Sequence, residues 1–397
     1  MLQTFWENFR HNLFKPLLLF FYMGFMVPIL QVEFEFPHII YQGLTIYLLV
    51  SIGWHGGEEL AKLDNTILTQ ALKFMGVGFV TNFLIGVTAY FLLRSLTKLR
   101  RVDAATVAGY YGSDSAGTFA TCMGVLNGLI AMGQTEFKPA AYMPVMLAVM
   151  EIPGCLVALF LVSRLRRDGM DALGNMPDEE GYNADAIAPV VVEGDDKANE
   201  GSHGKVTDLI SPGVRPKPPG LFSRALLHEV FFNPGLYLLF GGILIGYLSQ
   251  KQGTNVTRED DTLFLGLFQG LLCLFLLEMG MTASRKLKDL KRGGVPFIIL
   301  GVAMPVLFAT LGIVVAHVFS MVVQQELTLG TYVLFSVLCA AASYIAVPAV
   351  QRLAIPEASP TLPLAASLGL TFSFNVTIGI PMYIEIARYL MKAFPAV

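Results

Sequence analysis

The sequence predicts an all-α integral membrane protein built from two five-helix halves, and three observations carry this prediction. The 397 residues are 54% hydrophobic and 14% charged, against roughly 25% charged in ordinary soluble domains. Apolar runs of about 20 residues, enough to cross a bilayer as a helix, recur along the chain. Short motifs of the first half return in the second. A mean hydropathy of +0.60 leaves too few polar groups to cover a soluble globule.

Ten apolar runs are the candidate membrane spans. In the first half they lie at 13–30, 39–56, 68–93, 104–132 and 139–163. In the second half they lie at 232–249, 262–283, 295–323, 329–350 and 361–390. The fourth and ninth are the least apolar because they are rich in Gly, Ala, Ser and Pro. The first run holds Lys15 and Pro16 without a clean cleavage site after it, so we expect a retained helix rather than a signal peptide.

A polar segment separates the two halves. Residues 164–224 are rich in Asp, Glu, Gly and Asn and show no amphipathic period, which predicts a largely flexible acidic linker. The domains are then 1–163 and 225–397, with five helices each. Lys and Arg gather in the linker, in Arg94–Arg101 and in Arg285–Arg292. The positive-inside rule therefore places the linker in the cytoplasm and both termini outside.

The two halves share motifs at nearly constant separation. The matching pairs are Ile152-Pro153 with Ile380-Pro381, Ser115 with Ser343, and Gly53 with Gly280. A repeat with an odd number of spans must be inverted relative to its twin. Inverted repeats are typical of secondary transporters, in which discontinuous helices form the binding site near the middle of the membrane.

The fourth and ninth spans are expected to be the discontinuous pair. The sequence favours breaks within Gly109–Thr118 and within Ala340–Pro348, where small residues let two helices approach. A broken helix leaves backbone N–H groups unpaired, and these bind anions with the helix dipole behind them.

Asp114 is the sharpest single signal for a site. A carboxylate inside a span is costly and therefore indicates function. Hydroxyls at Ser113, Ser115 and Thr118 surround it in sequence and suit a hard cation that prefers oxygen ligands. The alternative is that Asp114 lies in a water-filled vestibule and only caps a half-helix.

Four other polar residues lie within the apolar runs and are candidates for a supporting shell. They are Glu151, Glu278, Asn375 and Thr377. The two acids could relay a proton or lie at a subunit contact instead. The two polar residues of the tenth span lie near the expected middle of the membrane.

Other classes of function find no support. The net charge of −3 argues against a nucleic-acid partner, and the four cysteines are scattered through apolar segments. The string His55-Gly56-Gly57-Glu58-Glu59 lacks a second His or Cys at ligand spacing, so a helix end is favoured over a metal site. No Walker A run or nucleophile elbow is present. We expect neither an enzyme nor an organic cofactor.

Several of these motifs, taken in order, are similar to those of the sodium-dependent bicarbonate transporters of cyanobacteria and their bacterial relatives. The resemblance covers both membrane halves. It rests on Val102–Ala105 leading to Gly112–Thr118, on Gly53–Gly57, on Met279–Met281, and on Ala354-Ile355-Pro356 followed by Ser359-Pro360.

The resemblance implies core and gate domains, an elevator-type movement, a homotrimer in the bacterial cytoplasmic (inner) membrane, and a small PII-like cytoplasmic regulator. It also implies bicarbonate between the broken spans, with sodium beside it. The anion-binding positions would be Gly112, Ser113, Ser115, Ala116, Gly117, Thr118, Ala342, Ser343 and Tyr344. The sodium ligands would be Asp114, Ser115, Thr118 and Ser343.

The chain departs from that family at three places. Tyr344 stands where the cyanobacterial members carry an acid after a run of serines, and Asp114 stands where they carry a neutral residue. Thr371-Phe372-Ser373 replaces their Gly-Thr-Pro. Three hypotheses follow: a sodium-coupled importer of bicarbonate or a similarly small anion, a carrier for another small carboxylate coupled to sodium or protons, and a transporter-like receptor that signals to a cytoplasmic partner.

Overall fold

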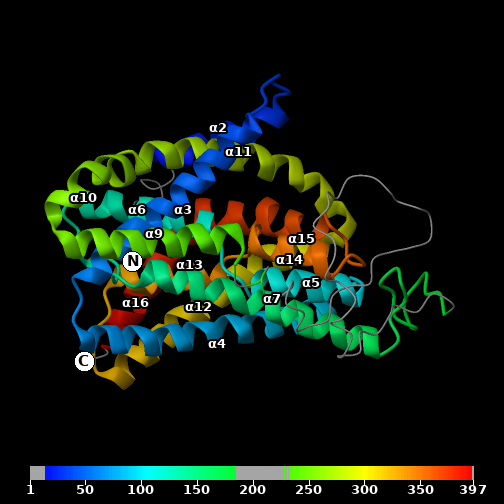
Figure 1. Cartoon of the computed structure of the whole chain (residues 1–397). Helices are drawn as coiled ribbons and strands as arrows, with labels where there is room; N and C mark the ends of the chain where they lie inside the picture. Colours follow the sequence, from blue (N-terminus) through cyan, green and yellow to red (C-terminus); the bar gives the residue numbers. More distant parts are fainter. Residues whose placement is uncertain (1–13, 185–227, 229, 231, 396–397) are drawn as a thin grey trace, which may run out of the picture.

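The computed structural model describes residues 14–184 and 232–395, together with 228 and 230. These residues form helices and no β-strand. The long helices run broadly side by side, with α4 and α11 along opposite sides of the bundle (Figure 1). Residues 185–224 of the expected linker lie outside the described residues.

Helices occupy all five apolar runs of the first half. They are α2 (Pro16–Ile29), α3 (His38–Ala61), α4 (Asn65–Leu96), α5 (Arg101–Tyr111), α6 (Ala116–Ala131) and α7 (Met143–Arg167). The fourth run is thus two helices, separated by residues 112–115. A short 3₁₀ turn, Thr135–Phe137, precedes α7.

Helices also occupy the five runs of the second half. They are α9 (Pro234–Gln252), α10 (Thr254–Asp261), α11 (Phe268–Lys286), α12 (Gly294–Val323), α13 (Leu329–Ala340), α14 (Ala346–Ala354), α15 (Leu362–Leu364) and α16 (Ile380–Ala393). The ninth run is again two helices, separated by residues 341–345. Three π-helical segments, Thr262–Gly266, Ala365–Phe372 and Asn375–Gly379, and a 3₁₀ segment, Leu287–Gly293, complete this half.

Five helical segments are long and apolar enough to cross a membrane by length and composition. They are Thr66–Leu96, Met143–Arg167, Thr254–Lys291, Gly294–Val323 and Leu362–Ala393. Helices α2 and α13 are apolar but shorter. The count of ten spans and the inverted repeat stay predictions, because several helices are too short for this criterion and α3 and α9, although long enough, are not among the five segments.

The ends of several helices follow from local side-chain chemistry. A side-chain oxygen accepts a hydrogen bond from a backbone N–H at the start of α4 (Asp64), α6 (Ser115), α9 (Asn233) and α13 (Thr328). Such caps satisfy N–H groups that have no partner within the helix. First-turn positions, where proline costs no hydrogen bond, hold Pro16, Pro144 and Pro234.

The helices pack in two groups. One, which we call the scaffold group, is formed by α2, α3, α9 and α11, with α3 along α9 and α2 along α11. The other, the site group, is formed by α4–α7 and α12–α16. Each group combines helices from both halves of the chain. The groups meet where α11 contacts the π-helical segment Ala365–Phe372 and where α7 contacts α9.

Glycines bring the scaffold helices into direct backbone contact. A Cβ on Gly53 or Gly57 of α3 would overlap main-chain atoms of α9, and a Cβ on Gly242 or Gly246 of α9 would overlap those of α3. On each helix the two glycines are four residues apart and so share one face. Gly24 of α2 and Gly280 of α11 make the matching contact between those helices. Small residues at such crossings let membrane helices pack closely.

Candidate functional site

The first interruption, residues 112–115, lies between α5 and α6. Ser115 begins α6: its Oγ accepts a hydrogen bond from the Thr118 N–H at 3.3 Å and from the Thr118 hydroxyl at 3.0 Å. Gly112 lies against Gly86 and Gly154, which explains why the chain can turn within a packed bundle. The first turn of α6 therefore begins inside the protein, with its N-terminal amides directed into the interruption.

Asp114 is buried at this interruption, with a side chain 1% exposed. Neither carboxylate oxygen has a hydrogen-bond partner among the described residues. The cap of α6 is Ser115, not Asp114. The structure thus disfavours the alternative in which Asp114 only caps a half-helix, since a buried carboxylate normally accepts hydrogen bonds and Asp114 accepts none from the described residues.

The surroundings of Asp114 contain no compensating cation among the described residues. Its ionisable neighbours are Glu151 of α7 and Cys339 of α13. Ser113 connects the interruption to α7, since its hydroxyl donates a 2.6 Å hydrogen bond to the carbonyl oxygen of Glu151. Two buried acids therefore lie close together, and no basic side chain of the described residues neutralises them.

The second interruption, residues 341–345, meets the first through the main chain. The Ser343 N–H donates a hydrogen bond of 2.8 Å to the carbonyl oxygen of Tyr110, at the end of α5. Ser343 Oγ in turn lies 3.5 Å from the N–H of Val347, in the first turn of α14. The two broken spans that the sequence singles out are thus in direct contact.

Tyr344 extends from the second interruption to the start of α6. Its hydroxyl lies beside Ser115 and Gly117, so close that a Cβ on Gly117 would overlap it. Ala116 and Gly117 also line a cavity of about 10 Å³, whose other walls are Phe275, Ile345 and the α3 residues Thr45, Leu48, Leu49 and Ile52. That volume holds about one water molecule.

The expected supporting residues divide into two sets. Asn375 reaches the ninth span, because its Nδ2 donates to the carbonyl oxygen of Ala340 at 3.0 Å and its Oδ1 accepts from Tyr383 at 2.6 Å. Glu151 lies beside Asp114. Thr377 instead donates to Ser373 within its own helix at 2.7 Å, and Glu278 on α11 accepts from Thr282 at 2.9 Å. No hydrogen bond joins Thr377 or Glu278 to either interruption in the described part of the chain, so their place in the site stays a prediction.

Asn82 of α4 lies directly behind the first interruption. Its Nδ2 donates to the carbonyl oxygen of Met150 at 2.9 Å, while its Oδ1 is buried without a partner among the described residues. Its carbonyl lies against Gly112. A lone Asn in a long apolar helix is commonly a contact between helices, and only the fold places this one behind the interruption.

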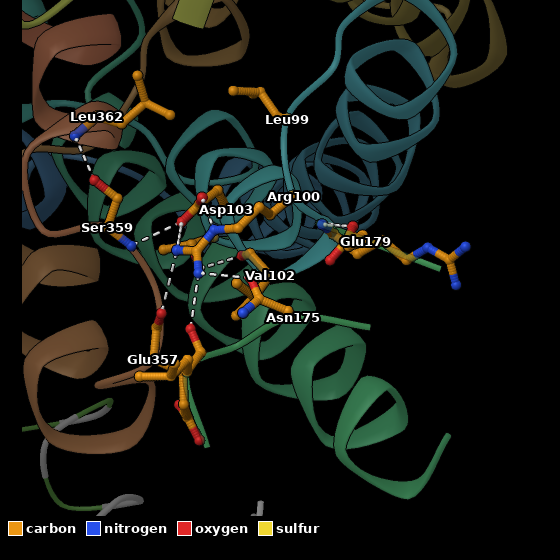
Figure 2. Close-up of polar contacts among 12 residues, drawn as sticks. Leu99, Arg100, Val102, Asp103, Asn175, Glu179, Glu357, Ser359 and Leu362 are labelled. Atoms are coloured by element: carbon orange, nitrogen blue, oxygen red, sulfur yellow. Dashed lines mark hydrogen bonds and ion pairs between the residues drawn. The ribbon is translucent and has the colours of Figure 1, made fainter. Parts of the chain in front are cut away.

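The end of α5 away from the site is fixed by a polar cluster (Figure 2). Arg100 donates to both carboxylate oxygens of Asp103, at 2.8 and 3.1 Å, and to the carbonyl of Leu173 at 2.7 Å. Asp103 also accepts from the Ser359 N–H at 2.7 Å. The cluster joins α5 to the segment after α7 and to the loop after α14, so it holds the helix that leads into the interruption.

The segment after α7 is itself organised around Asp171. This buried carboxylate accepts hydrogen bonds from the backbone N–H groups of Leu173, Asn175 and Asn183 at 2.9, 2.7 and 3.0 Å. Burial alone would raise its pKa, but these hydrogen bonds hold the pKa of Asp171 below its usual range. The described beginning of the expected linker is therefore packed against α5.

The arrangement offers oxygen ligands to a small, hard cation. Asp114 offers two free carboxylate oxygens, and Thr118, whose hydroxyl donates to Ser115, keeps its own lone pairs available. Such oxygens suit a hard cation. No group of three or more His, Cys, Asp or Glu side chains able to hold a metal ion occurs in the described part of the chain.

Comparison with known proteins gives a family. No curated protein matches the chain. The model of the Na⁺-dependent bicarbonate transporter superfamily matches residues 16–388, which include both interruptions and almost every described helix. The predicted resemblance is confirmed, and the chain belongs to the Na⁺-dependent bicarbonate transporter superfamily as a multi-pass membrane transporter rather than an enzyme.

Proposed function

We propose that this transporter imports bicarbonate or a similarly small anion together with sodium, and that both bind where the two interruptions meet. The observation that carries the proposal is the buried carboxylate of Asp114, which has no partner among the described residues. Burying an ionised group without compensation costs several kcal/mol. A sodium ion on Asp114 removes that cost and supplies positive charge beside the start of α6.

The anion takes the other side of the same space. The N-terminal amides of α6 provide donors and a favourable dipole for negative charge. Sodium on Asp114 and Thr118 then lowers the cost of placing an anion in a low-dielectric interior. Because neither ion is well accommodated alone, the inward sodium gradient drives uptake of the anion.

An elevator-type movement is our proposal for how the site reaches both sides of the membrane. The scaffold group is held by main-chain contacts at Gly53, Gly57, Gly242 and Gly246, which suits a gate domain that keeps its shape. The site group carries both interruptions and suits a core domain that moves as one body. We further propose ten spans arranged as an inverted repeat, a homotrimer, and control by a PII-like cytoplasmic regulator.

The proposed orientation places the segment after α7 in the cytoplasm and α10 outside a bacterial inner membrane. All four cysteines are buried, so single exposed cysteines can report on each side. We expect Asp260→Cys, on α10, to react with a membrane-impermeant maleimide in intact cells. Glu180→Cys should react only after permeabilisation, and the reverse pattern would invert the topology.

Uptake of labelled bicarbonate into proteoliposomes tests the function directly. The purified protein is measured with an inward sodium gradient, with equal sodium on both sides, and with potassium in place of sodium. Accumulation that needs the sodium gradient supports the proposal. Uptake of a different carboxylate alone, driven by sodium or by protons, selects the second hypothesis, and binding without accumulation selects a receptor.

A further inference from the structure

The aromatic ring of Tyr344 occupies the space in front of the first turn of α6. The side chain is buried, with 8% of its surface exposed. Its hydroxyl lies beside Ser115 and Gly117 without a hydrogen bond of normal geometry to either. Among the described residues, the buried Tyr344 hydroxyl and the carboxylate of Asp114 both lack a hydrogen-bond partner, and both lie at the start of α6, where buried polar groups normally have one.

Neighbouring rings hold Tyr344 in this position. Its ring packs edge-on against Phe372, with centroids 5.8 Å apart, and Phe372 packs in the same way against Phe21 of α2 at 6.0 Å. Phe372 and Phe21 are both buried. Because the core behind the ring is close-packed, the ring cannot retreat without displacing Phe372.

The open space at the start of α6 is very small. A cavity of about 10 Å³ lies between Ala116 and Gly117 of α6, Phe275, Ile345 and the α3 residues Thr45, Leu48, Leu49 and Ile52. Gly117 is the residue that makes room for the Tyr344 hydroxyl, since a Cβ there would overlap it. Any anion at the start of α6 therefore shares its space with the phenol ring.

We propose that Tyr344 sets the upper size of the anion that this transporter accepts. The inference rests on the proposed anion site and adds a specificity-determining residue to it. With the ring in place, only a flat anion of a few heavy atoms can share this space, whereas a carboxylate with an alkyl tail collides with the ring. One additional methylene in a tight pocket changes selectivity by about 10- to 200-fold.

The test is a binding series on the full-length protein in nanodiscs with sodium present. Affinities are measured for bicarbonate, formate, acetate and propionate in the wild type, Tyr344→Phe and Tyr344→Ala. We expect the wild type and Tyr344→Phe, which keeps the ring, to prefer bicarbonate or formate over propionate by at least about tenfold. In Tyr344→Ala that preference should fall to within about threefold, because the ring volume is gone.

Three outcomes overturn the inference. The size preference could persist in a Tyr344→Ala protein that still unfolds cooperatively, it could be absent from the wild type, or it could vanish in Tyr344→Phe. Tyr344→Leu, which keeps a buried apolar side chain of smaller volume, provides the same comparison if the alanine variant does not fold. If the wild type binds none of the four anions, the proposed function itself fails, and that result is distinct from an unchanged size preference.

Discussion

The backbone N–H of Ser343 donates a hydrogen bond to the carbonyl oxygen of Tyr110 at 2.8 Å, and this bond joins the two interrupted spans. Because only main-chain atoms take part, the junction does not depend on the side chain at either position. The Ser343 hydroxyl oxygen lies 3.5 Å from the backbone nitrogen of Val347, in the first turn of α14. Side chains at the junction can therefore vary for ligand binding while the contact between the broken helices persists.

Replacing Asp114 with Asn should abolish sodium-driven uptake and leave the protein folded. The amide keeps the shape of the side chain but removes the negative charge that attracts the cation, and it removes the cost of a buried charge. Uptake in proteoliposomes and the thermal unfolding midpoint are the two measurements. Asp168→Asn, at an exposed position, is the matched control. Full activity in Asp114→Asn would remove Asp114 from the mechanism.

Gly246→Ala should destabilise the protein by about 1–3 kcal/mol, the usual cost of overpacking. The added methyl group would overlap the carbonyl oxygen of Trp54 and push α9 away from α3. Gly241→Ala on the same helix is the control, because a Cβ there meets no atom within 4 Å. We expect Gly241→Ala to leave the unfolding midpoint unchanged or raised. Equal midpoints for the two variants would contradict a backbone contact at Gly246.

The buried ion pair between Arg166 and Glu357 should show strong coupling. Two hydrogen bonds join the side chains, at 3.0 and 2.8 Å, and their exposed fractions are 10% and 6%. Arg166→Met leaves the Glu357 carboxylate unpaired and should cost about 3–5 kcal/mol of unfolding free energy. Adding Glu357→Met should recover much of that loss.

These single and double variants form a double-mutant cycle. An exposed ion pair at the end of α7 serves as the comparison for it. Arg164 and Asp168 lie 3.9 Å apart, and both side chains are more than half exposed. Surface pairs contribute about 0–1 kcal/mol, so Arg164→Met should change the unfolding free energy little. If the changes in unfolding free energy caused by Arg166→Met and Glu357→Met simply add in the double variant, the two residues are not coupled.

The stability of the segment after α7 should depend on pH through the titration of Asp171. A carboxyl whose pKa is lowered on folding contributes stability above its unfolded pKa, near 3.9 for Asp, and that contribution is lost as the pH falls through the folded pKa. Asp171→Asn should therefore expose residues 168–183 to proteolysis at neutral pH. Hydrogen exchange of this segment in the two proteins should converge at strongly acidic pH. A constant difference at all pH values would exclude the titration of Asp171 as the cause.

The helical runs and both interruptions could be predicted from the sequence because their signals are local. Polarity and small residues within Gly109–Thr118 and Ala340–Pro348 mark the breaks. Within the first of these, the structure narrows the interruption to residues 112–115, where the Ser115 cap starts α6. The π-helical segments of the tenth run have no comparable sequence signal, since they depend on packing against α11 and α12.

The site is only partly predictable because its contacts are long-range. The sequence indicates Asp114 through the cost of a charge in a span, but Glu151 and Cys339 become its neighbours only when α7 and α13 pack. The position of Tyr344 beside Gly117 likewise depends on two segments far apart in the chain. The hydrogen bonds that organise the segment around Asp171 could not be predicted from the sequence, because this segment is as polar as the rest of the expected linker.

The glycine contact between α3 and α9 also bears on biosynthesis. Helix α3 enters the membrane before the chain from α4 to α7 and the whole linker have been made, so its partner is not yet available. During that interval Gly53 and Gly57 lack the main chain of α9 that packs against them in the folded protein. The pairing of α3 with α9 therefore takes place only after the first half has been translated. Two separately expressed halves, divided within the linker, should accordingly associate in the bilayer.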